Sequence, residues 1–357
     1  MPPFEELNWK FPRMLANSSE VVLRNIDQLS ALNGLLLINP PADELMQQLG
    51  ETVQASTSDF ATYQRISSKR SNVHFGVELP RNQQFQGVLL FMPKAKEELR
   101  FRLAQACSVV DPNGFIFLLG HKKEGIAGGS TELKKWGRAC KVDTARHCQL
   151  WQLQPDQKHC SQPFDLDNYW QSYELPSGDN RHKVYNLPGV FSMNQLDQGT
   201  DFLLKEYPFP LKGHWLDFAC GAGVIGAWHQ LKNPDLKITG VDTSALALHC
   251  ARKTFADNGL QGDFFAANGF SAEPGYKRLP LDGIITNPPF HTGVKTDYSV
   301  TEQFITESVK NLRRGGRMVM VANSFLNYPA LLDSVYGNCK TIAKNNKFAI
   351  YESVRYE

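Results

Sequence analysis

Residues Trp215 to Gly226 read Trp-Leu-Asp-Phe-Ala-Cys-Gly-Ala-Gly-Val-Ile-Gly. A strand-like apolar run followed by Gly-x-Gly-x-x-Gly is typical of a strand that turns tightly into a helix, because glycine leaves no Cβ where the backbone approaches a ligand. Asp242 follows about twenty residues later, where a carboxylate can accept hydrogen bonds from two ribose hydroxyls. The pattern predicts a cofactor site at Gly221, Gly223 and Asp242, suited to NAD, FAD or S-adenosylmethionine.

The sequence around this turn alternates between short apolar runs and helical segments, which is typical of parallel βαβ units. The expected strands cover residues 214–218, 236–241, 263–267, 283–286 and 317–322, and the expected helices include 244–257 and 301–312. Two further runs, 340–344 and 348–355, predict an antiparallel pair at the end of the sheet. We therefore expect an α/β domain with a mainly parallel sheet.

One acidic residue favours S-adenosylmethionine over a dinucleotide. A dinucleotide site holds a pyrophosphate at the helix N-terminus, and its strand is normally apolar up to the first glycine. Here Asp217 lies inside the strand, four residues before Gly221. A carboxylate at that place would repel a pyrophosphate, whereas it can help to bind the ammonium group of a methionine moiety, directly or through water.

A second feature is the run Asn287-Pro288-Pro289-Phe290 after the fourth expected strand. Ligands bind at the carboxyl ends of parallel strands, and paired prolines stiffen a loop by fixing φ. The Asn287 side-chain oxygen and the Pro288 carbonyl would then be preset acceptors for a planar amino group. The Phe290 ring would offer a stacking surface. Considered alone, the run also fits a plain turn after a strand.

The first half of the chain carries a weaker copy of the second. Residues 86–93 parallel residues 282–289, and residues 112–119 parallel residues 315–320. A helical segment over residues 94–109 lies between them, as residues 301–312 do in the second half. This repetition predicts two related domains, with similarity between unrelated buried strands as the alternative.

A polar stretch with two prolines, residues 154–163, separates the halves. Immediately after it, residues 169–175 and 182–187 have the pattern of a β-hairpin. A length of 357 residues also suits two domains. We expect one domain over residues 1–160 and a second over residues 161–357.

The composition excludes several classes of protein. With 42% hydrophobic and 21% charged residues, the chain is neither disordered nor collagen-like. No apolar run approaches the roughly 18–20 residues of a membrane span, and the N-terminus lacks a secretory signal, so a cytoplasmic location without membrane association is expected. Seven scattered cysteines without a Cys-x-x-Cys pair indicate neither disulfides nor a metal site.

Charge alone does not identify a partner, since 38 basic and 36 acidic residues leave a net charge of only +2. Basic residues are most frequent between His121 and His147, where seven Lys and Arg outnumber three Asp and Glu. A solvated helix face and an RNA-contacting patch both explain this stretch.

Together these motifs make the second half resemble a class I S-adenosylmethionine-dependent methyltransferase. The Asn-Pro-Pro-Phe run resembles the motif of enzymes that methylate planar nitrogens, including adenine N6, guanine N2 and the glutamine amide. Four stretches extend the resemblance to the bacterial ribosomal RNA guanine-N2 methyltransferases: Leu187–Ser192, Leu196–Thr200, Asn287–His291 and Val321–Pro329. Residues 142–146 and 164–170 look most like the small-subunit (16S) RsmC type, whereas residues 337–339 and 345–348 also resemble the large-subunit relative.

The resemblance implies an α/β fold of two tandem Rossmann-like class I methyltransferase domains, the N-terminal one degenerate. Gly34–Pro41 stands where a cofactor turn would be, but it has one glycine and no strand carboxylate. Phe91 stands in the place of Asn287. The N-terminal domain is then expected to bind no S-adenosylmethionine, and to hold RNA and support the catalytic half.

The resemblance also implies further contacts for the cofactor, S-adenosyl-L-methionine. Asp197, Gly199 and Thr200 would contact its methionine end, and Asn268 would lie near its adenine. A helix N-cap is the alternative role for the first three residues, and capping is the alternative for Asn268.

The reaction that follows is direct transfer of the sulfonium methyl group to the exocyclic N2 of a guanine in 16S ribosomal RNA, by a monomer acting on the assembled small subunit. Asn287 and Pro288 would accept the two N–H groups of the amino nitrogen, and Phe290 would stack on the guanine. No metal or general base is needed. Three alternatives stay open: methylation of guanine N2 in large-subunit (23S) RNA, methylation of protein glutamine, and a non-catalytic RNA-binding assembly protein.

Overall fold

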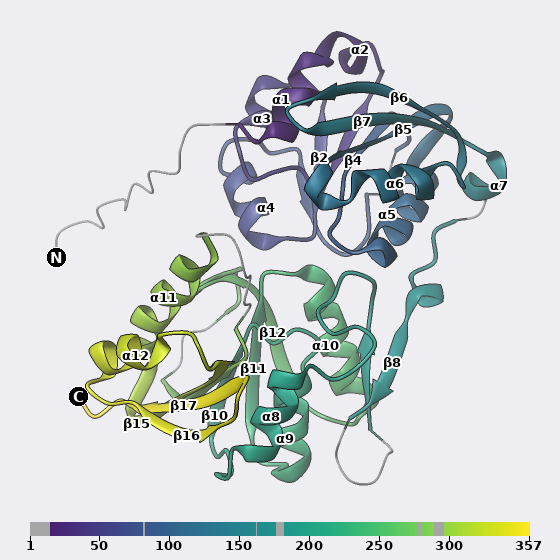
Figure 1. Ribbon diagram of the computed structural model, residues 1–357. Coiled ribbons are helices and arrows are strands. Elements are labelled where there is room, and N and C mark those ends of the chain that lie inside the picture. The colour runs from purple at the N-terminus through teal and green to yellow at the C-terminus, as the bar shows by residue number, and fades with distance from the viewer. Residues whose placement is uncertain (1–14, 81–82, 162, 176–181, 277–279, 289–295) are drawn as a thin grey trace. The chain divides into compact units, whose positions relative to one another are not determined.

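The computed structural model describes residues 15–80, 83–161, 163–175, 182–276, 280–288 and 296–357, with the backbone alone for 296–300 (Figure 1). The chain forms two compact units, Met1–Phe164 and Asp165–Glu357, which we call the N-terminal and C-terminal units. The division falls in the segment between the two sheets, after α7 (Gln157–Cys160) and before η2 (Leu166–Tyr169).

The C-terminal unit is built on an eight-stranded sheet of order β13-β12-β11-β10-β14-β15-β17-β16. Pairs from β12 to β15 are parallel, while β13, β17 and β16 pair antiparallel with their neighbours. The strands are β10 (His214–Phe218), β11 (Lys237–Asp242), β12 (Gly262–Asn268), β13 (Ser271–Ala272), β14 (Leu281–Thr286), β15 (Leu312–Asn323), β16 (Lys340–Lys344) and β17 (Phe348–Val354). The parallel series and the final antiparallel pair are therefore confirmed. The expected hairpin is also present, as β8 (Gln171–Glu174) and β9 (Lys183–Asn186).

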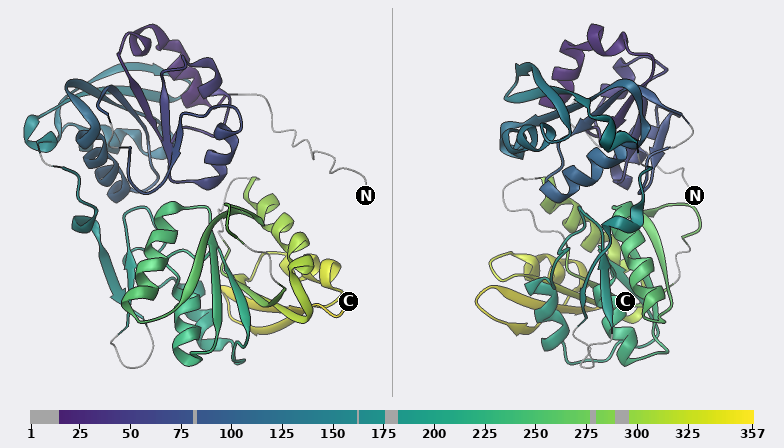
Figure 2. Two further views of the ribbon diagram at one scale, coloured as in Figure 1. Left: turned by 180° about the vertical axis from the view of Figure 1, so that it is seen from behind. Right: turned by 90° about the vertical axis from the view of Figure 1, so that its right-hand side faces the viewer.

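Helices cover both faces of this sheet (Figures 1 and 2). They are α8 (Gln198–Glu206), α9 (Val224–Lys232), α10 (Ala245–Asp257), α11 (Thr296–Ser308) with η3 (Val309–Asn311), and α12 (Tyr328–Tyr336). Helices α9 and α10 pack against β11 and β12, whereas α11 and α12 share a hydrophobic cluster on the other face. This is the doubly wound arrangement that the βαβ pattern predicts.

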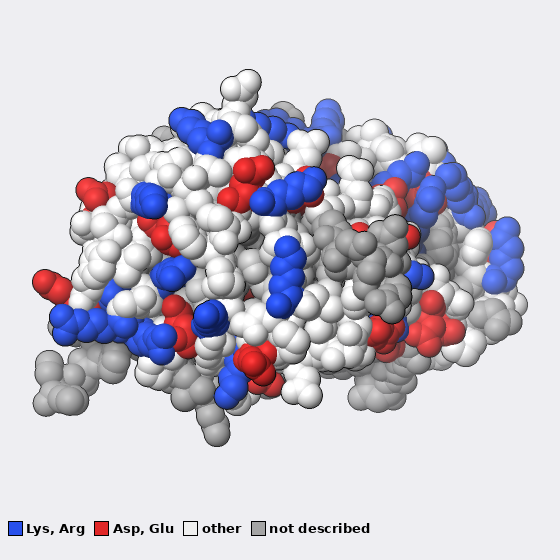
Figure 3. Space-filling model, turned by 90° about the horizontal axis from the view of Figure 1, so that it is seen from below, with Lys and Arg blue, Asp and Glu red and all other residues white. Residues whose placement is uncertain are grey.

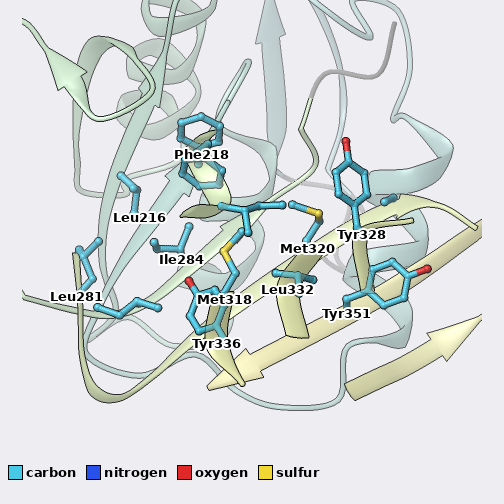
Figure 4. Packing of buried hydrophobic residues seen from close by; sticks show 14 of the residues in the cluster. Leu216, Phe218, Leu281, Ile284, Met318, Met320, Tyr328, Leu332, Tyr336 and Tyr351 are labelled. Atoms are coloured by element: carbon cyan, nitrogen blue, oxygen red, sulfur yellow. The ribbon is translucent and has the colours of Figure 1, made fainter. Parts of the chain in front are cut away.

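Side chains along β10 alternate between the two faces of the sheet, just before the glycine-rich turn of residues 219–223, which we call the cofactor turn. Leu216 and Phe218 point into the hydrophobic cluster with α11 and α12 (Figure 4), while Asp217 faces α9. Phe218 stacks on Phe304 of α11 with ring centroids 3.4 Å apart, and both rings are buried. Each such side chain contributes about 1.5–3 kcal/mol on burial. The core thereby holds the carboxyl end of β10 in place.

The N-terminal unit repeats this plan in a seven-stranded sheet of order β3-β2-β1-β4-β5-β7-β6. The strands are β1 (Leu35–Ile38), β2 (Gln54–Thr57), β3 (Val73–Phe75), β4 (Phe85–Phe91), β5 (Val110–His121), β6 (Gly137–Ala145) and β7 (Cys148–Pro155). The helices are α1 (Asn17–Arg24), α2 (Ile26–Ser30), α3 (Leu45–Gln48), α4 (Phe60–Ser67), α5 (Lys96–Val109), η1 (Lys122–Glu124) and α6 (Ile126–Leu133). Residues from α1 to α4 pack on one face of the sheet and residues from α5 and α6 on the other.

The two sheets correspond in detail. Leu35 pairs with Gly87 as Trp215 pairs with Gly283, and in each sheet a register shift directly precedes that glycine. The residue that directly follows β1, Asn39, and the residue that directly follows β10, Ala219, both have a left-handed backbone, with φ of 52° and 56°. Such agreement in bulge, register and turn confirms the internal duplication.

The basic stretch between residues 121 and 147 is not one helix face, contrary to the simpler expectation. It runs through η1 and α6 and continues along β6, an edge strand of the sheet. Lys141 and Arg138 lie on β6 and are exposed. Charged side chains on an edge strand discourage pairing with another chain.

The surface carries no broad field of one charge on the face seen in Figure 3, where basic and acidic side chains are interspersed. Among the helices that the structure describes, none combines the length and the apolar character needed to cross a membrane. Any recognition of a charged partner on this face must therefore depend on local groups of side chains.

Candidate active site

The turn of residues 219–223 connects β10 to α9, and every second residue in it has a left-handed backbone. Ala219, Gly221 and Gly223 have φ of 56°, 53° and 79°. A Cβ on Gly223 would come within 3.2 Å of Ala251 and Phe255, so this glycine is needed for packing against α10. A Cβ on Gly221 would meet no protein atom within 4 Å. Gly221 therefore borders open space, as a position facing a ligand should.

Asp217 lies directly below this turn and is fully buried. Its Oδ2 accepts a hydrogen bond of 3.0 Å from the Gly226 N–H, while Oδ1 has no partner within the described residues. Burial, and secondarily the charge of Asp242, raises the pKa of Asp217 to about 7, against the opposing effect of the Gly226 hydrogen bond. The carboxyl group thus fixes the first turn of α9 and has no surface exposed for direct contact with an ammonium group.

Asp242 ends β11 and is held by two backbone groups. Its Oδ2 accepts from the Gly221 N–H at 2.9 Å, and its Oδ1 accepts from the Ser244 N–H at 2.9 Å. These bonds join the ends of β10 and β11 and fix the direction of the carboxylate beside the open side of Gly221. Ser244 in turn is the N-cap of α10.

Asn287 is the centre of a second network. Its Nδ2 donates to Asp197 Oδ2 and to Thr200 Oγ1, both at 2.9 Å. Asp197 is the N-cap of α8 and its Oδ2 also accepts from the Thr200 N–H at 2.9 Å. Because both amide hydrogens are directed to α8, the side-chain oxygen Oδ1 must face away from it. The same Asp197 oxygen therefore caps α8 and holds the Asn287 side chain.

Three further residues predicted for the site, Gly199, Pro288 and Asn268, lie within the described ranges. Gly199 lies inside the Asn287 network, where a Cβ would come within 3.2 Å of Phe348 and 3.5 Å of Asn287 Nδ2. Pro288 is buried and Asn268 is exposed at the end of β12, where it pairs with Ser271. Pro289, Phe290 and His291 lie outside the described residues.

No metal centre accompanies these residues in the described ranges, where no group of three or more His, Cys, Asp or Glu side chains could hold an ion. Cys220, in the turn itself, is buried, and burial raises the pKa of its thiol well above the usual value. A neutral thiol suits a small packing residue rather than a nucleophile.

Comparison with known proteins places the chain in a family. Residues 19–173 match the methyltransferase small domain N-terminal family, and residues 181–352 match the methyltransferase small domain. The chain is 38% and 39% identical to the ribosomal RNA small subunit methyltransferases C of Pseudomonas putida and Pseudomonas fluorescens, over 94% of this chain and 98% of each relative. The chain belongs to the ribosomal RNA small subunit methyltransferase C family. It is a methyltransferase with two tandem methyltransferase domains, as its sequence predicts.

The fold of this methyltransferase is also similar to a solved structure, the T. thermophilus 16S rRNA N2 G1207 methyltransferase in complex with AdoMet and guanosine. The TM-score is 0.77 at 20% sequence identity, with 90% of this chain and 88% of that chain covered. The similarity covers both units and supports the tandem fold.

Two structural features of the candidate site have no sequence signal. The bond from Asn287 to Asp197 joins residues ninety positions apart. Thr286 Oγ1 donates to the Phe218 carbonyl at 2.8 Å and ties the strand before Asn287 to the strand before the cofactor turn. Thr286 is fully buried and would pass as an ordinary strand residue.

Proposed function

We propose that this protein methylates the exocyclic N2 of a guanine in 16S ribosomal RNA, with S-adenosyl-L-methionine as methyl donor. The observation that carries the proposal is the held amide of Asn287, whose two hydrogens bind α8 and whose oxygen faces the opposite way. An oxygen fixed in this manner at the carboxyl end of β14 is suited to accept a hydrogen bond from a planar amino group. The named activities of the relatives, on small-subunit RNA and on guanine N2, support the same substrate.

The cofactor turn fits S-adenosyl-L-methionine by two observations. Gly221 borders open space in which a ligand can approach the backbone, and Asp242 is held beside it. Below the turn, the fully buried Asp217 fixes the first turn of α9 through its hydrogen bond from the Gly226 N–H. We place the ribose at Asp242, the adenine near Asn268 and the methionine end near Asp197, Gly199 and Thr200. The bound cofactor supplies an electrophilic methyl group.

The protein contributes position rather than acid–base chemistry. A guanine amino nitrogen is a weak nucleophile because its lone pair is delocalised into the ring, so its orientation limits the reaction. Asn287 Oδ1 and the Pro288 carbonyl would accept its two N–H groups and turn the lone pair toward the methyl group. Pro289 would stiffen this loop and Phe290 would stack on the base. Holding reactants in such an arrangement lowers the barrier by restricting their motion in advance.

The two units would divide the work. The C-terminal unit carries the cofactor turn and Asn287, and we assign catalysis to it. We assign RNA binding and support to the N-terminal unit, where hydrophobic Leu37 and Phe91 occupy the places of Asp217 and Asn287. We further propose that the protein acts as a monomer in the cytoplasm, on the assembled small subunit.

The test is transfer of labelled methyl from S-adenosyl-L-methionine to small subunits, large subunits and free ribosomal RNA from cells that lack this protein, followed by nucleoside analysis. We expect N2-methylguanosine in the small subunit. Asn287→Ala should reduce the rate about a hundredfold or more, because it removes an orienting group. Asn113→Ala, at an exposed asparagine of the N-terminal unit, is the matched control and should retain full activity.

The outcomes separate the alternatives. Label in the large subunit alone would keep the chemistry and contradict the proposed RNA. Label in glutamine side chains of proteins and in no RNA would contradict the nucleic-acid substrate. Binding of the cofactor without transfer to any substrate would favour an assembly factor.

A further inference from the structure

Phe325 is the most exposed large hydrophobic side chain in the described part of the chain. Its exposed fraction is 70%, and the others that are exposed are Phe191 (68%), Tyr356 (62%) and Phe209 (38%). Leaving such a ring in water forgoes about 1.5–3 kcal/mol of burial free energy. Phe325 lies in the short connection between β15 and α12, next to Leu326, which is buried.

Hydrogen bonds link this connection to the candidate active site. Strand β15 runs parallel to β14, so both strands end at the edge of the sheet that carries Asn287. The Ser324 N–H donates to the Lys347 carbonyl at 2.9 Å, and Lys347 Nζ donates to Gln198 Oε1 at 2.6 Å. Gln198 directly follows Asp197, which holds Asn287. Phe325 therefore belongs to the rim of the same site.

The rim is also basic. Lys344 and Lys347 flank the turn between β16 and β17, and both are exposed. Between them lie two neutral residues, Asn345 and Asn346. No acidic side chain pairs with either lysine in the ranges that the structure describes. A local positive charge thus accompanies the exposed ring.

We propose that Phe325, Lys344 and Lys347 form a contact surface for an unpaired nucleotide next to the target guanosine. The base stacks on the Phe325 ring, and the lysines attract the neighbouring phosphates. An aromatic ring beside cations is the usual composition of surfaces that bind single-stranded RNA. The inference rests on the proposed function and adds to it the state of the substrate, which must be unpaired on one side of the guanine.

A protein partner suits this surface less well. Stable protein interfaces bury about 800 Å² on each partner around an apolar centre. Here one ring is exposed, while Leu326 and Tyr328 are buried and Asn327 is polar and exposed. A single nucleobase matches the area of one ring, whereas a folded protein does not.

The experiment compares Phe325→Ala with Phe209→Ala in the full-length protein. Phe209 is the matched control, because it is also exposed but lies beside Arg317 near the start of β14, at the opposite edge of the sheet. Steady-state kinetics would give KM for 16S RNA and for S-adenosyl-L-methionine separately, and filter binding would give the affinity for a 16S fragment. Thermal unfolding checks that each variant is folded.

Phe325→Ala should weaken RNA binding about 5- to 150-fold, which corresponds to one stacked base, and leave cofactor KM unchanged. Phe325→Trp should restore binding. Substitution of both Lys344 and Lys347 by Ala should make the negative slope of log affinity against log salt shallower by about 1.4. Equal RNA affinities for Phe325→Ala and Phe209→Ala would overturn the inference, as would crosslinking from position 325 to ribosomal protein alone. If the unsubstituted protein methylates no RNA, the proposed function is wrong. The inference about Phe325 is then tested by the RNA affinities alone.

Discussion

A side-chain amide can exchange the places of its oxygen and nitrogen by rotation about one bond. In Asn287 that rotation is blocked, because Asp197 and Thr200 both accept from Nδ2. A rotated amide would place Oδ1 against the Asp197 carboxylate and lose both hydrogen bonds, at a cost of about 1–3 kcal/mol for each unsatisfied group. Asn287 was identifiable from the sequence as an acceptor, but the residues that orient it were not.

Asp217 gives a residue-level prediction about pH. Its pKa is raised from 3.8 to about 7, mainly by burial. The unfolded chain therefore releases this proton near pH 4 and the folded chain near pH 7, so this group makes folding less favourable as pH rises from 4 to 7, with no further change above. The neutral variant Asp217→Asn should lose that dependence.

The measurement is the urea midpoint of both proteins between pH 4 and 8. The difference between them isolates Asp217 from groups that act oppositely, such as His229, whose pKa burial lowers to about 3. If the urea midpoints of the two proteins changed with pH in parallel, the Asp217 carboxyl group would be ionised throughout this range, and the prediction would be wrong.

At the scale of elements, each of the two sheets has a glycine at the same strand position, covered by a different large side chain. Gly283 on β14 lies under the Trp215 ring, and Gly87 on β4 lies under Leu32 and Leu35. Trp215 is buried and its Nε1 donates to the Lys212 carbonyl at 2.9 Å, which holds the ring. Leu32 is only half-buried, and such a side chain has more room to change rotamer.

Gly283→Ala should therefore destabilise the protein by about 1–3 kcal/mol, because the new Cβ would overlap a ring that cannot move. Gly87→Ala should cost less, since Leu32 can change rotamer. Free energies of unfolding from urea titration of each variant test this order. A larger loss for Gly87→Ala would mean that Trp215 relaxes more readily than Leu32.

At the scale of the whole molecule, one fold occurs twice, and only the C-terminal unit carries the candidate site residues. Aligned by strand register, Leu37, Thr57 and Phe91 of the N-terminal unit occupy the places of Asp217, Asp242 and Asn287. Thr57 keeps the local bond of its counterpart, accepting from the Asp59 N–H at 3.1 Å as Asp242 accepts from Ser244. A buried guanidinium, Arg102, donates to the neighbouring Ser58 hydroxyl at 2.7 Å. The N-terminal unit therefore has a similar backbone at this turn, with uncharged residues in place of Asp217 and Asp242.

Calorimetric titration of the full-length protein should therefore show one S-adenosyl-L-methionine per chain. Asp242→Ala should abolish or strongly reduce the heat of binding, because it removes the proposed ribose contact. Thr57→Ala, at the equivalent position, should leave the titration unchanged. A stoichiometry of two would assign a working site to the N-terminal unit.

The sequence by itself determined the strands, the turn and the family. Apolar periodicity located β10, β11, β12, β14 and β15 within a few residues, because a strand's pattern depends on its own side chains. The glycine turn and the Asn-Pro-Pro-Phe run were visible for the same reason, since their chemistry lies within a few consecutive positions. The helix expected over residues 244–257 begins one position later only because Ser244 serves as its cap.

The tertiary structure alone decided which residues cooperate. It brought Asp197 to Asn287 and buried Asp217 completely. It also placed part of the basic stretch on the edge strand β6, and it left Phe325 exposed next to Ser324, whose N–H bonds to the Lys347 carbonyl. Each of these depends on packing between segments far apart in the chain, where one side chain's burial and hydrogen bonds are set by neighbours that its local sequence does not specify.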